Sequence, residues 1–320
     1  MKPAICVLAL LFLSPAVFGQ SRAPLNKDPK SVKFVTTDIA NFWRAYDLAA
    51  KEPDRAKKIV IFQAEYIDKG SPGLKDFVQL RIKNAEALVD QIEKMPRFYT
   101  SARQQTLEVA TIERRLRSNF ERFKKLYPDA VFPDVYFVIG ISSTGGTTGP
   151  SGLLIGAEMY SLNKATPLEE LPAWLKTVLA PVKQVPAIVA HESCHYNQQL
   201  KGKKDLLAKA IQEGSCDLIG ELVSGSNINE HLQKYADPRA ADLWAEFSSQ
   251  MSGNDISKWV YNGSKSTDRP GDLGYYIGYK IAESYYRHTR DKRQAVRDIL
   301  NIGDFEAFLK ASGYQPAGQM

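Results

Sequence analysis

The sequence predicts an α+β fold that is mostly helical and contains one small sheet. Apolar residues recur every three or four positions over most of the chain up to Leu126, which is typical of amphipathic helices. Two short apolar runs follow at 135–141 and 153–159, and helical periodicity resumes after Pro167. Because the strands are grouped rather than alternating with helices, we expect a small antiparallel sheet packed against a mostly helical body.

The start of the chain, residues 1–19, has the features of a signal peptide. Lys2 precedes an apolar run from Ala4 to Leu13, and cleavage is expected after Gly19. The run is shorter than the roughly 20 apolar residues that a membrane helix needs. Gln20 stands where a lipoprotein would carry a cysteine. We therefore expect a periplasmic or secreted protein without a membrane span.

Residues 20–126 are expected to form a helical N-terminal region. It begins with a polar segment, 20–33, and it ends at Tyr127-Pro128-Asp129, which interrupts the helical periodicity. The apolar positions that carry the period include Leu80, Ile82, Ala85, Leu88 and Ile92, and then Ile112, Leu116, Phe120 and Phe123. The remaining region, 127–320, holds the expected sheet and the candidate site.

The two expected strands are rich in β-branched and aromatic residues. Between them lies SSTGGTTGPSG, 142–152, whose glycines and proline favour a wide hairpin loop. This loop lacks the Gly-Lys-Ser/Thr of a phosphate-binding loop. The expected helices after it lie near 168–180, 186–200, 205–224, 238–251, 273–289 and 291–312.

The composition is that of a folded protein with no sign of nucleic-acid binding. Hydrophobic residues make up 44% of the 320 positions, which suffices for a sizeable core. The formal net charge is a modest +6, and the densest basic stretch, 113–125, interleaves acidic and apolar residues. Such a stretch is typical of a solvated helix face, so we expect no nucleic-acid partner.

The motif with the clearest chemistry is HESCH at 191–195, on an expected helix that opens near Pro186. With about 3.6 residues per turn, His191 and His195 lie one turn apart on one face and can reach the same metal ion. Glu192 lies beside that face, where a carboxylate can take a proton from a water that attacks a carbonyl. The alternative is a helix on which both histidines are ordinary polar residues with satisfied hydrogen bonds.

Glu213, on the next expected helix, is the candidate for a third ligand. A short polar link lets this helix pack antiparallel to the helix of His195, and Gly214 and Gly220 allow close approach. Catalytic zinc usually takes three protein ligands and leaves one position open. Asp217, one turn after Glu213, is placed to accept the second N–H of a ligand histidine. We therefore expect one Zn²⁺ at this site.

At these motifs the chain resembles the gluzincin clan of metallopeptidases, on the basis of HESCH at 191–195 and EGSCD at 213–217. It is more closely similar to a bacterial family of predicted zinc-dependent proteases related to the gliding-motility lipoprotein B, over roughly residues 130–290. The other segments that carry this similarity are FPDVYFVIG (132–140), LLIGAEMY (153–160) and GYYIGYKIAESYY (274–286).

The resemblance implies a zincin-like fold in which one edge of the sheet lies above the metal and the substrate binds along it. Residues 153–159 would form that edge. It also implies hydrolysis of a peptide or protein substrate, with Glu192 as the general base.

Other aromatic and histidine residues have weaker signals. Hydrolases of this kind use a Tyr, His or Arg to stabilise the developing oxyanion. The helix near 274 offers Tyr275, Tyr276 and Tyr279, of which we single out Tyr275, although tyrosines at such spacing also serve packing. His231 and His288 lie among polar and charged residues and are expected on the surface.

Two cysteines remain after the expected removal of the signal peptide, which includes Cys6. Cys194 and Cys216 each follow a candidate ligand by three residues on its helix. They are candidates for a disulfide between the two helices in an oxidising compartment. Two buried thiols that only pack are equally compatible with the sequence.

The sequence thus predicts a zinc-dependent hydrolase of peptide bonds. The alternative is a zinc-stabilised envelope or binding protein without turnover, in which the metal joins two helices. A third possibility is a hydrolase of another amide, such as a peptide link of the cell wall.

Overall fold

A computed structural model describes residues 26–316 except Ser264 and Thr267. The signal peptide expected over 1–19 lies outside these residues. Within the described part of the chain, every helix is too short or too polar to cross a membrane.

The helices expected before Leu126 are present. Several begin at side-chain caps, since Asp54, Ser71 and Asn84 accept hydrogen bonds from backbone N–H groups of the following turn. Two segments, η1 and η2, are π-helices. The bounds are α1 (Thr37–Ala49), α2 (Arg55–Phe62), η1 (Gln63–Ile67), α3 (Pro72–Phe77), η2 (Val78–Ile82), α4 (Ala85–Lys94), α5 (Pro96–Glu108), η3 (Val109–Ile112) and α6 (Glu113–Leu126).

The sheet has four strands in the order β1-β2-β4-β3 and is mixed. Its strands are β1 (Phe34–Val35), β2 (Val135–Val138), β3 (Gly146–Gly149) and β4 (Gly152–Gly156). β1 and β2 are parallel, β2 and β4 are parallel, and β3 is antiparallel to β4. The prediction of an antiparallel sheet was therefore wrong. The physical reason is that the glycine-rich segment expected as a loop forms β3, and this extra reversal turns β2 and β4 in the same direction.

The expected sheet edge at 153–159 is also corrected. The strand stops at Gly156, and Ala157–Tyr160 forms a 3₁₀-helix, η4. β4 lies inside the sheet between β2 and β3, so the exposed edge on this side is β3. The apolar character of β4 follows from this central place, because all five of its residues are buried.

The second half of the chain is helical, with two departures from the expected bounds. Pro172 separates η5 from α7, and a break before Asp304 divides the expected helix 291–312 into α13 and α14. Helix α10 was not expected. The bounds are η5 (Leu168–Glu170), α7 (Ala173–Val178), η6 (Val182–Gln184), α8 (Val185–Asn197), α9 (Leu206–Ser224), α10 (Glu230–Ala236), η7 (Asp237–Arg239), α11 (Ala240–Ser248), α12 (Leu273–His288), α13 (Lys292–Leu300) and α14 (Phe305–Ser312).

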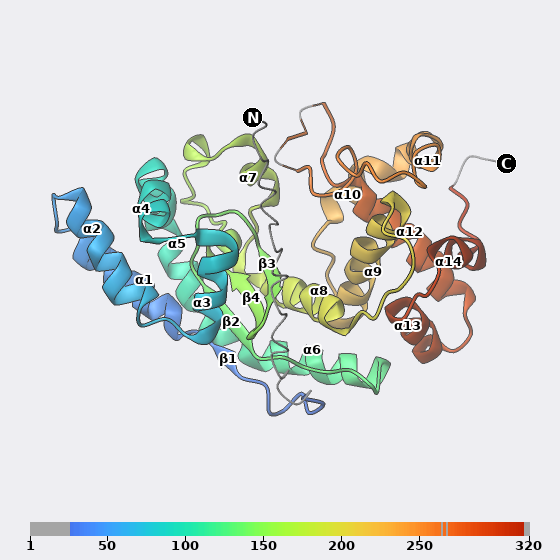
Figure 1. Cartoon of the computed structure of the whole chain (residues 1–320), viewed down its shortest axis with the longest axis horizontal. Coiled ribbons are helices and arrows are strands. Elements are labelled where there is room, and N and C mark those ends of the chain that lie inside the picture. Colours follow the sequence, from blue (N-terminus) through green and yellow to red (C-terminus); the bar gives the residue numbers. More distant parts are fainter. Residues whose placement is uncertain (1–25, 264, 267, 317–320) are drawn as a thin grey trace, which may run out of the picture.

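Helix α8 lies at the centre of the molecule, between the sheet and α9 (Figure 1). Helices α1 to α5 lie on the other side of the sheet from α9 to α14. Helix α6 packs against α8 and α9, since Asn119 donates a hydrogen bond to the carbonyl of Pro186 and Arg122 donates one to the carbonyl of Val223. One hydrophobic core contains buried residues from both halves.

Glycines bring α9 into close contact with its neighbours. A Cβ on Gly278 of α12 would lie 1.8 Å from the carbonyl oxygen of Ala210, and one on Gly214 would lie 2.0 Å from the backbone nitrogen of Tyr279. Gly214 therefore allows contact with α12 rather than with α8. Gly220 faces α8, since its Cβ would lie 3.2 Å from the nitrogen of His191.

Candidate metal centre

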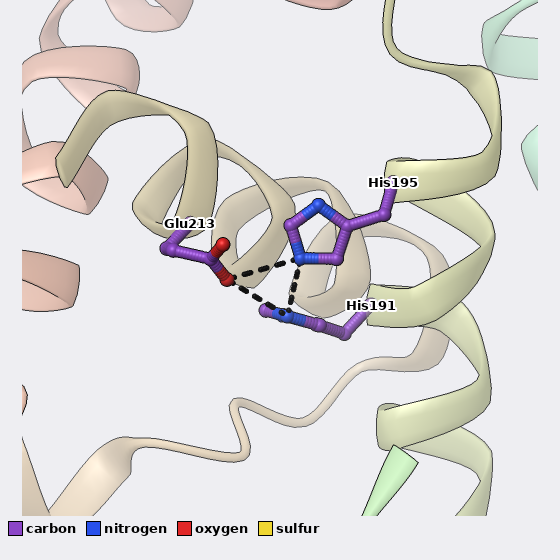
Figure 2. A group of neighbouring side chains, drawn as sticks. All are labelled: His191, His195 and Glu213. Atoms are coloured by element: carbon purple, nitrogen blue, oxygen red, sulfur yellow. Dashed lines mark hydrogen bonds and ion pairs between the residues drawn. The ribbon is translucent and has the colours of Figure 1, made fainter. Parts of the chain in front are cut away.

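His191 and His195 project from one face of α8 toward α9, as the helical spacing predicts (Figure 2). Pro186 lies in the first turn of this helix, where its missing N–H costs nothing. The two Nε2 atoms lie 3.0 Å apart, and the rings meet nearly edge to face. Both side chains are largely withdrawn from solvent, so their free nitrogens share one small space.

Glu213 of α9 completes the group. Its Oε2 lies 3.1 Å from Nε2 of His195 and 3.8 Å from Nε2 of His191, as Figure 2 shows. An ion with tetrahedral bonds of about 2.0–2.1 Å holds its ligand atoms about 3.3 Å apart. The three observed distances bracket this value, and two imidazoles with a carboxylate are a common donor set for a divalent metal. These three residues could therefore hold one metal ion.

The charges at the group favour a cation. Burial lowers the pKa of His195, but the Glu213 carboxylate outweighs it and holds the pKa at about 9. Burial raises the pKa of Glu213, but the two imidazoles outweigh it and hold the pKa at about 2. Glu213 is therefore ionised at neutral pH in a buried place, which a positive charge between it and the histidines stabilises.

A network of amide groups orients His195. Its Nδ1 lies 2.9 Å from Oε1 of Gln198, and the amide nitrogen of Gln198 donates to the carbonyl of Gln212 and to Oγ of Ser215. Because the Gln198 oxygen accepts, Nδ1 keeps its proton, and once His195 loses its second proton Nε2 presents a lone pair to the site. The sequence motifs gave no sign of this role for Gln198.

Asp217 lies where the sequence predicts it, behind a ligand histidine. Its Oδ1 is 2.8 Å from Nδ1 of His191, at ion-pair distance rather than in an aligned hydrogen bond. Its Oδ2 accepts a hydrogen bond from Nδ2 of Asn229 at 2.8 Å. Asp217 thus lies beside Nδ1 of His191, and the other ring nitrogen, Nε2, is the one near Glu213.

Glu192 faces the sheet edge next to the candidate ligands. A Cβ on Gly146 of β3 would lie 2.8 Å from both Cγ and Oε1 of Glu192, so β3 can pass this close because residue 146 has no side chain. Glu192 is 7% exposed. Burial raises its pKa, and the imidazoles of His195 and His191 act against this rise.

A cavity of about 1250 Å³ opens onto the group. Its wall includes Glu192 and all three candidate ligands, together with β3 and the loop before it. His231 also lines this cavity, while His288 does not. Both histidines are exposed, as expected from the sequence.

Tyr261 is a functional candidate that the sequence did not reveal. Its hydroxyl donates a hydrogen bond of 2.5 Å to Oε1 of Glu213, which leaves Oε2 directed at the histidines. The residue has a φ of 58°, an uncommon backbone conformation for tyrosine. Tyr275 lines the same cavity, and its ring packs edge-on against Tyr261.

The other two tyrosines of α12 point elsewhere. The hydroxyl of Tyr276 donates to Asp237, and that of Tyr279 donates to Glu221. Neither residue lines the cavity. They serve packing and hydrogen bonding within the helical half.

Of the two arrangements that the sequence left open for the cysteines, the structure has the disulfide. Cys194 of α8 and Cys216 of α9 are bonded, with their Cα atoms 5.3 Å apart, and both are fully buried. Sγ of Cys216 also lies 3.4 Å from Nδ1 of His195. The two helices that carry the candidate ligands are therefore covalently joined beside the site.

The fold and the site together define a class: a mostly helical α+β protein with a buried His-His-Glu group beside a sheet edge. A family model described as gliding motility protein GldB matches residues 24–316, which is most of the chain. The protein belongs to this family. Comparisons with curated proteins and with solved structures give no match.

Proposed function

We propose that the protein is a zinc-dependent hydrolase of peptide bonds, in which His191, His195 and Glu213 hold one Zn²⁺ and Glu192 is the general base. The observation that carries this proposal is the convergence of donor atoms from buried His191 and Glu213 and half-buried His195, with the carboxylate of Glu192 beside them on the wall of one cavity.

Zinc suits this donor set, because a catalytic zinc site usually has three protein ligands, and the three residues here line a cavity. When bound, the ion would supply Lewis acidity and lower the pKa of water to about 7. Gln198 and Asp217 hold the two imidazoles so that each presents Nε2. A structural zinc site usually uses four protein ligands and needs no free carboxylate beside it.

Glu192 is placed to move a proton. Its carboxylate would accept a proton from the attacking water and then donate it to the leaving amine. A carboxylate accepts and then donates a proton most effectively when its pKa is raised toward neutrality. Burial raises the pKa of Glu192. The closeness of Gly146 places the sheet edge directly beside this carboxylate.

Strand β3 gives an extended peptide a place to bind. It pairs with β4 on one side alone, so its other edge offers backbone groups to a further strand. Substrate bound in this way would place one of its carbonyls beside Glu192. Tyr275, which lines the same cavity, is the candidate for stabilising the oxyanion.

The second candidate function is a non-catalytic envelope protein in which the metal joins two helices. The family assignment and the disulfide both support a place in the cell envelope, where oxidation is possible. However, the disulfide already joins α8 and α9, so a metal is not needed for that purpose.

One experiment separates the two candidates. The protein lacking residues 1–19 is loaded with Zn²⁺, its metal content is measured, and it is incubated with a mixed peptide library whose products are read by mass spectrometry. Cleavage that depends on zinc and disappears in Glu192→Gln supports the hydrolase. Full zinc content with no cleavage of any peptide supports the non-catalytic protein.

A further inference from the structure

One positively charged side chain, that of an arginine, lies on the wall of the cavity among carboxylates and histidines. Of the described residues that line the cavity, Arg81 is the sole lysine or arginine. It comes from the N-terminal half of the chain, on the π-helix η2, and its side chain is exposed. π-Helices are rare and occur often at functional sites.

Arg81 lies at a defined point along the sheet edge. Its Nη2 donates a hydrogen bond of 3.2 Å to Oγ1 of Thr147 in β3. Thr147 directly follows Gly146, the residue that faces Glu192, and adjacent Cα atoms are about 3.8 Å apart. The charge of Arg81 is near enough to act on Glu192, whose pKa it helps to lower against the effect of burial.

On the side of Gly146 away from Thr147, the strand edge adjoins apolar side chains. Gly145 precedes Gly146, and a Cβ on Gly145 would lie 2.4 Å from the hydroxyl oxygen of Tyr160. Tyr160 lines the cavity, and so do the apolar side chains Met159, Trp174, Val178, Leu179 and Ile188. Three consecutive residues along the edge therefore meet different groups: Gly145 meets Tyr160 of the apolar lining, Gly146 meets the carboxylate of Glu192, and Thr147 meets the guanidinium of Arg81.

Arg81 has donors to spare. A guanidinium carries five N–H groups, and the described structure gives Arg81 one hydrogen bond, to a neutral hydroxyl. The planar fork of an arginine can bind a carboxylate through two parallel hydrogen bonds. Arg81 therefore lines the cavity with most of its N–H groups unused, and it is bonded to the strand residue that follows Gly146.

We propose that Arg81 binds a carboxylate of the substrate, and that the substrate is a peptide with this carboxylate on one side of the cleaved bond and an apolar side chain on the other. This inference rests on the proposed function, because a bond is cleaved here only if the protein is a hydrolase. The carboxylate can come from an Asp or Glu side chain or from the free C-terminus of the peptide, and both sources offer the same two oxygens.

Binding tests the subsite without relying on turnover. Zinc-loaded Glu192→Gln is titrated into three fluorescent peptides that share an apolar residue: one with Glu and an amidated C-terminus, one with Gln and an amidated C-terminus, and one with Gln and a free C-terminus. Fluorescence anisotropy gives each Kd. We expect the Glu peptide, the free-acid peptide or both to bind roughly ten- to a hundredfold more tightly than the neutral one.

Variants then assign the preference to Arg81. In the same Glu192→Gln protein, Arg81→Gln should abolish the preference, so that the charged and neutral peptides have equal Kd values, and Arg81→Lys should retain part of it. The matched control is Arg115→Gln, which removes the same charge from an exposed position on α6 that does not line the cavity. Equal binding of all three peptides, or a preference that survives Arg81→Gln, would overturn the proposal.

The two proposals fail in different ways. If Arg81 confers a preference for carboxylates but the zinc-loaded wild-type protein cleaves none of the peptides, the hydrolase is refuted and the anion subsite stands. If the wild-type protein cleaves charged and neutral peptides equally and Arg81→Gln does the same, the subsite is refuted and the hydrolase stands.

Discussion

The hydroxyl of Tyr261 lies 2.5 Å from Oε1 of Glu213, and the other oxygen of that carboxylate faces both histidines. The hydrogen bond thus selects which oxygen is free to bind a metal. Tyr261→Phe removes this restraint, so we expect the zinc affinity to fall about 10- to 100-fold, as for other partners of metal ligands. Competition with a chelator of known affinity measures it.

Tyr275→Phe is the matched control, because it removes a neighbouring hydroxyl from the same cavity. We expect it to keep the zinc affinity of the wild-type protein and to lower kcat, in line with a role at the oxyanion. Equal zinc affinities for the wild-type protein and Tyr261→Phe would show that the hydrogen bond does not position Glu213.

Glu192→Gln should keep the metal and lose hydrolysis. The amide has nearly the same shape as the carboxylate but cannot accept the proton, and general-base catalysis contributes about 10²- to 10⁴-fold. Metal content by mass spectrometry and initial rates on a cleaved peptide measure the two effects. Glu230→Gln, at an exposed position on α10, is the control and should change neither. A zinc-loaded Glu192→Gln with the wild-type rate would disprove the mechanism.

Glu213→Ala should lose most of the bound zinc after dialysis. It leaves two imidazoles as protein ligands, which is a poor site for Zn²⁺, and it removes the buried negative charge that holds the pKa of His195 at about 9. The zinc-to-protein ratio before and after dialysis measures the loss. Full occupancy in the variant would mean that another residue is the third ligand.

Glu158 makes the stability of the fold depend on pH. Its carboxyl is fully buried, Oε1 accepts a hydrogen bond from the backbone of Ser142, and Oε2 has no partner in the described structure. Burial raises its pKa from 4.5 to about 7, although backbone hydrogen bonds act against this. The folded state therefore keeps a proton that the unfolded state loses.

Protonated Glu158 contributes its full share of the free energy of unfolding below pH 4.5, and this contribution is lost as the pH rises to about 7. The loss amounts to about 3 kcal/mol. Glu158→Gln cannot titrate, so its free energy of unfolding should change less between pH 5 and pH 7.5 than that of the wild-type protein. Urea denaturation in the presence of EDTA at both pH values measures the difference. Parallel pH profiles for the two proteins would contradict the prediction.

Removing the disulfide should destabilise the metal-free protein. Cys194 and Cys216 are 22 residues apart, and closing a loop of this size contributes about 3 kcal/mol through the entropy of the unfolded chain. The double variant Cys194→Ala/Cys216→Ala should therefore unfold at a lower urea concentration. Intact mass after alkylation without reduction is the companion measurement, and two labels on the wild-type protein would show that the bond is absent.

The candidate ligands could be predicted because local geometry determines their positions. His191 and His195 are one helical turn apart in any helix, and Glu213 lies on the neighbouring helix after a short link. Asp217 follows Glu213 by a turn and reaches His191 for the same reason. These relationships depend on the helical repeat and on little else.

The features that were not predicted from the sequence depend on contacts between distant parts of the chain. The segment 146–149, GTTG, has no apolar alternation, and it becomes a strand because β4 offers it a partner. Tyr261 belongs to an irregular segment between α11 and α12, and Arg81 is far from the metal motifs in sequence. Their places at the cavity depend on the packing of the whole molecule.

The covalent link between α8 and α9 has a consequence for how the protein handles metal. In zinc fingers the ligands come together only when the chain folds around the metal, so a chelator that removes the metal unfolds the protein. Here the bond from Cys194 to Cys216 holds the ligand-bearing helices together whether or not an ion is bound. If the proposed Zn²⁺ binds here, it would therefore enter a site whose helices are already joined, and on the proposed function the supply of metal would turn hydrolysis on and off without unfolding the protein.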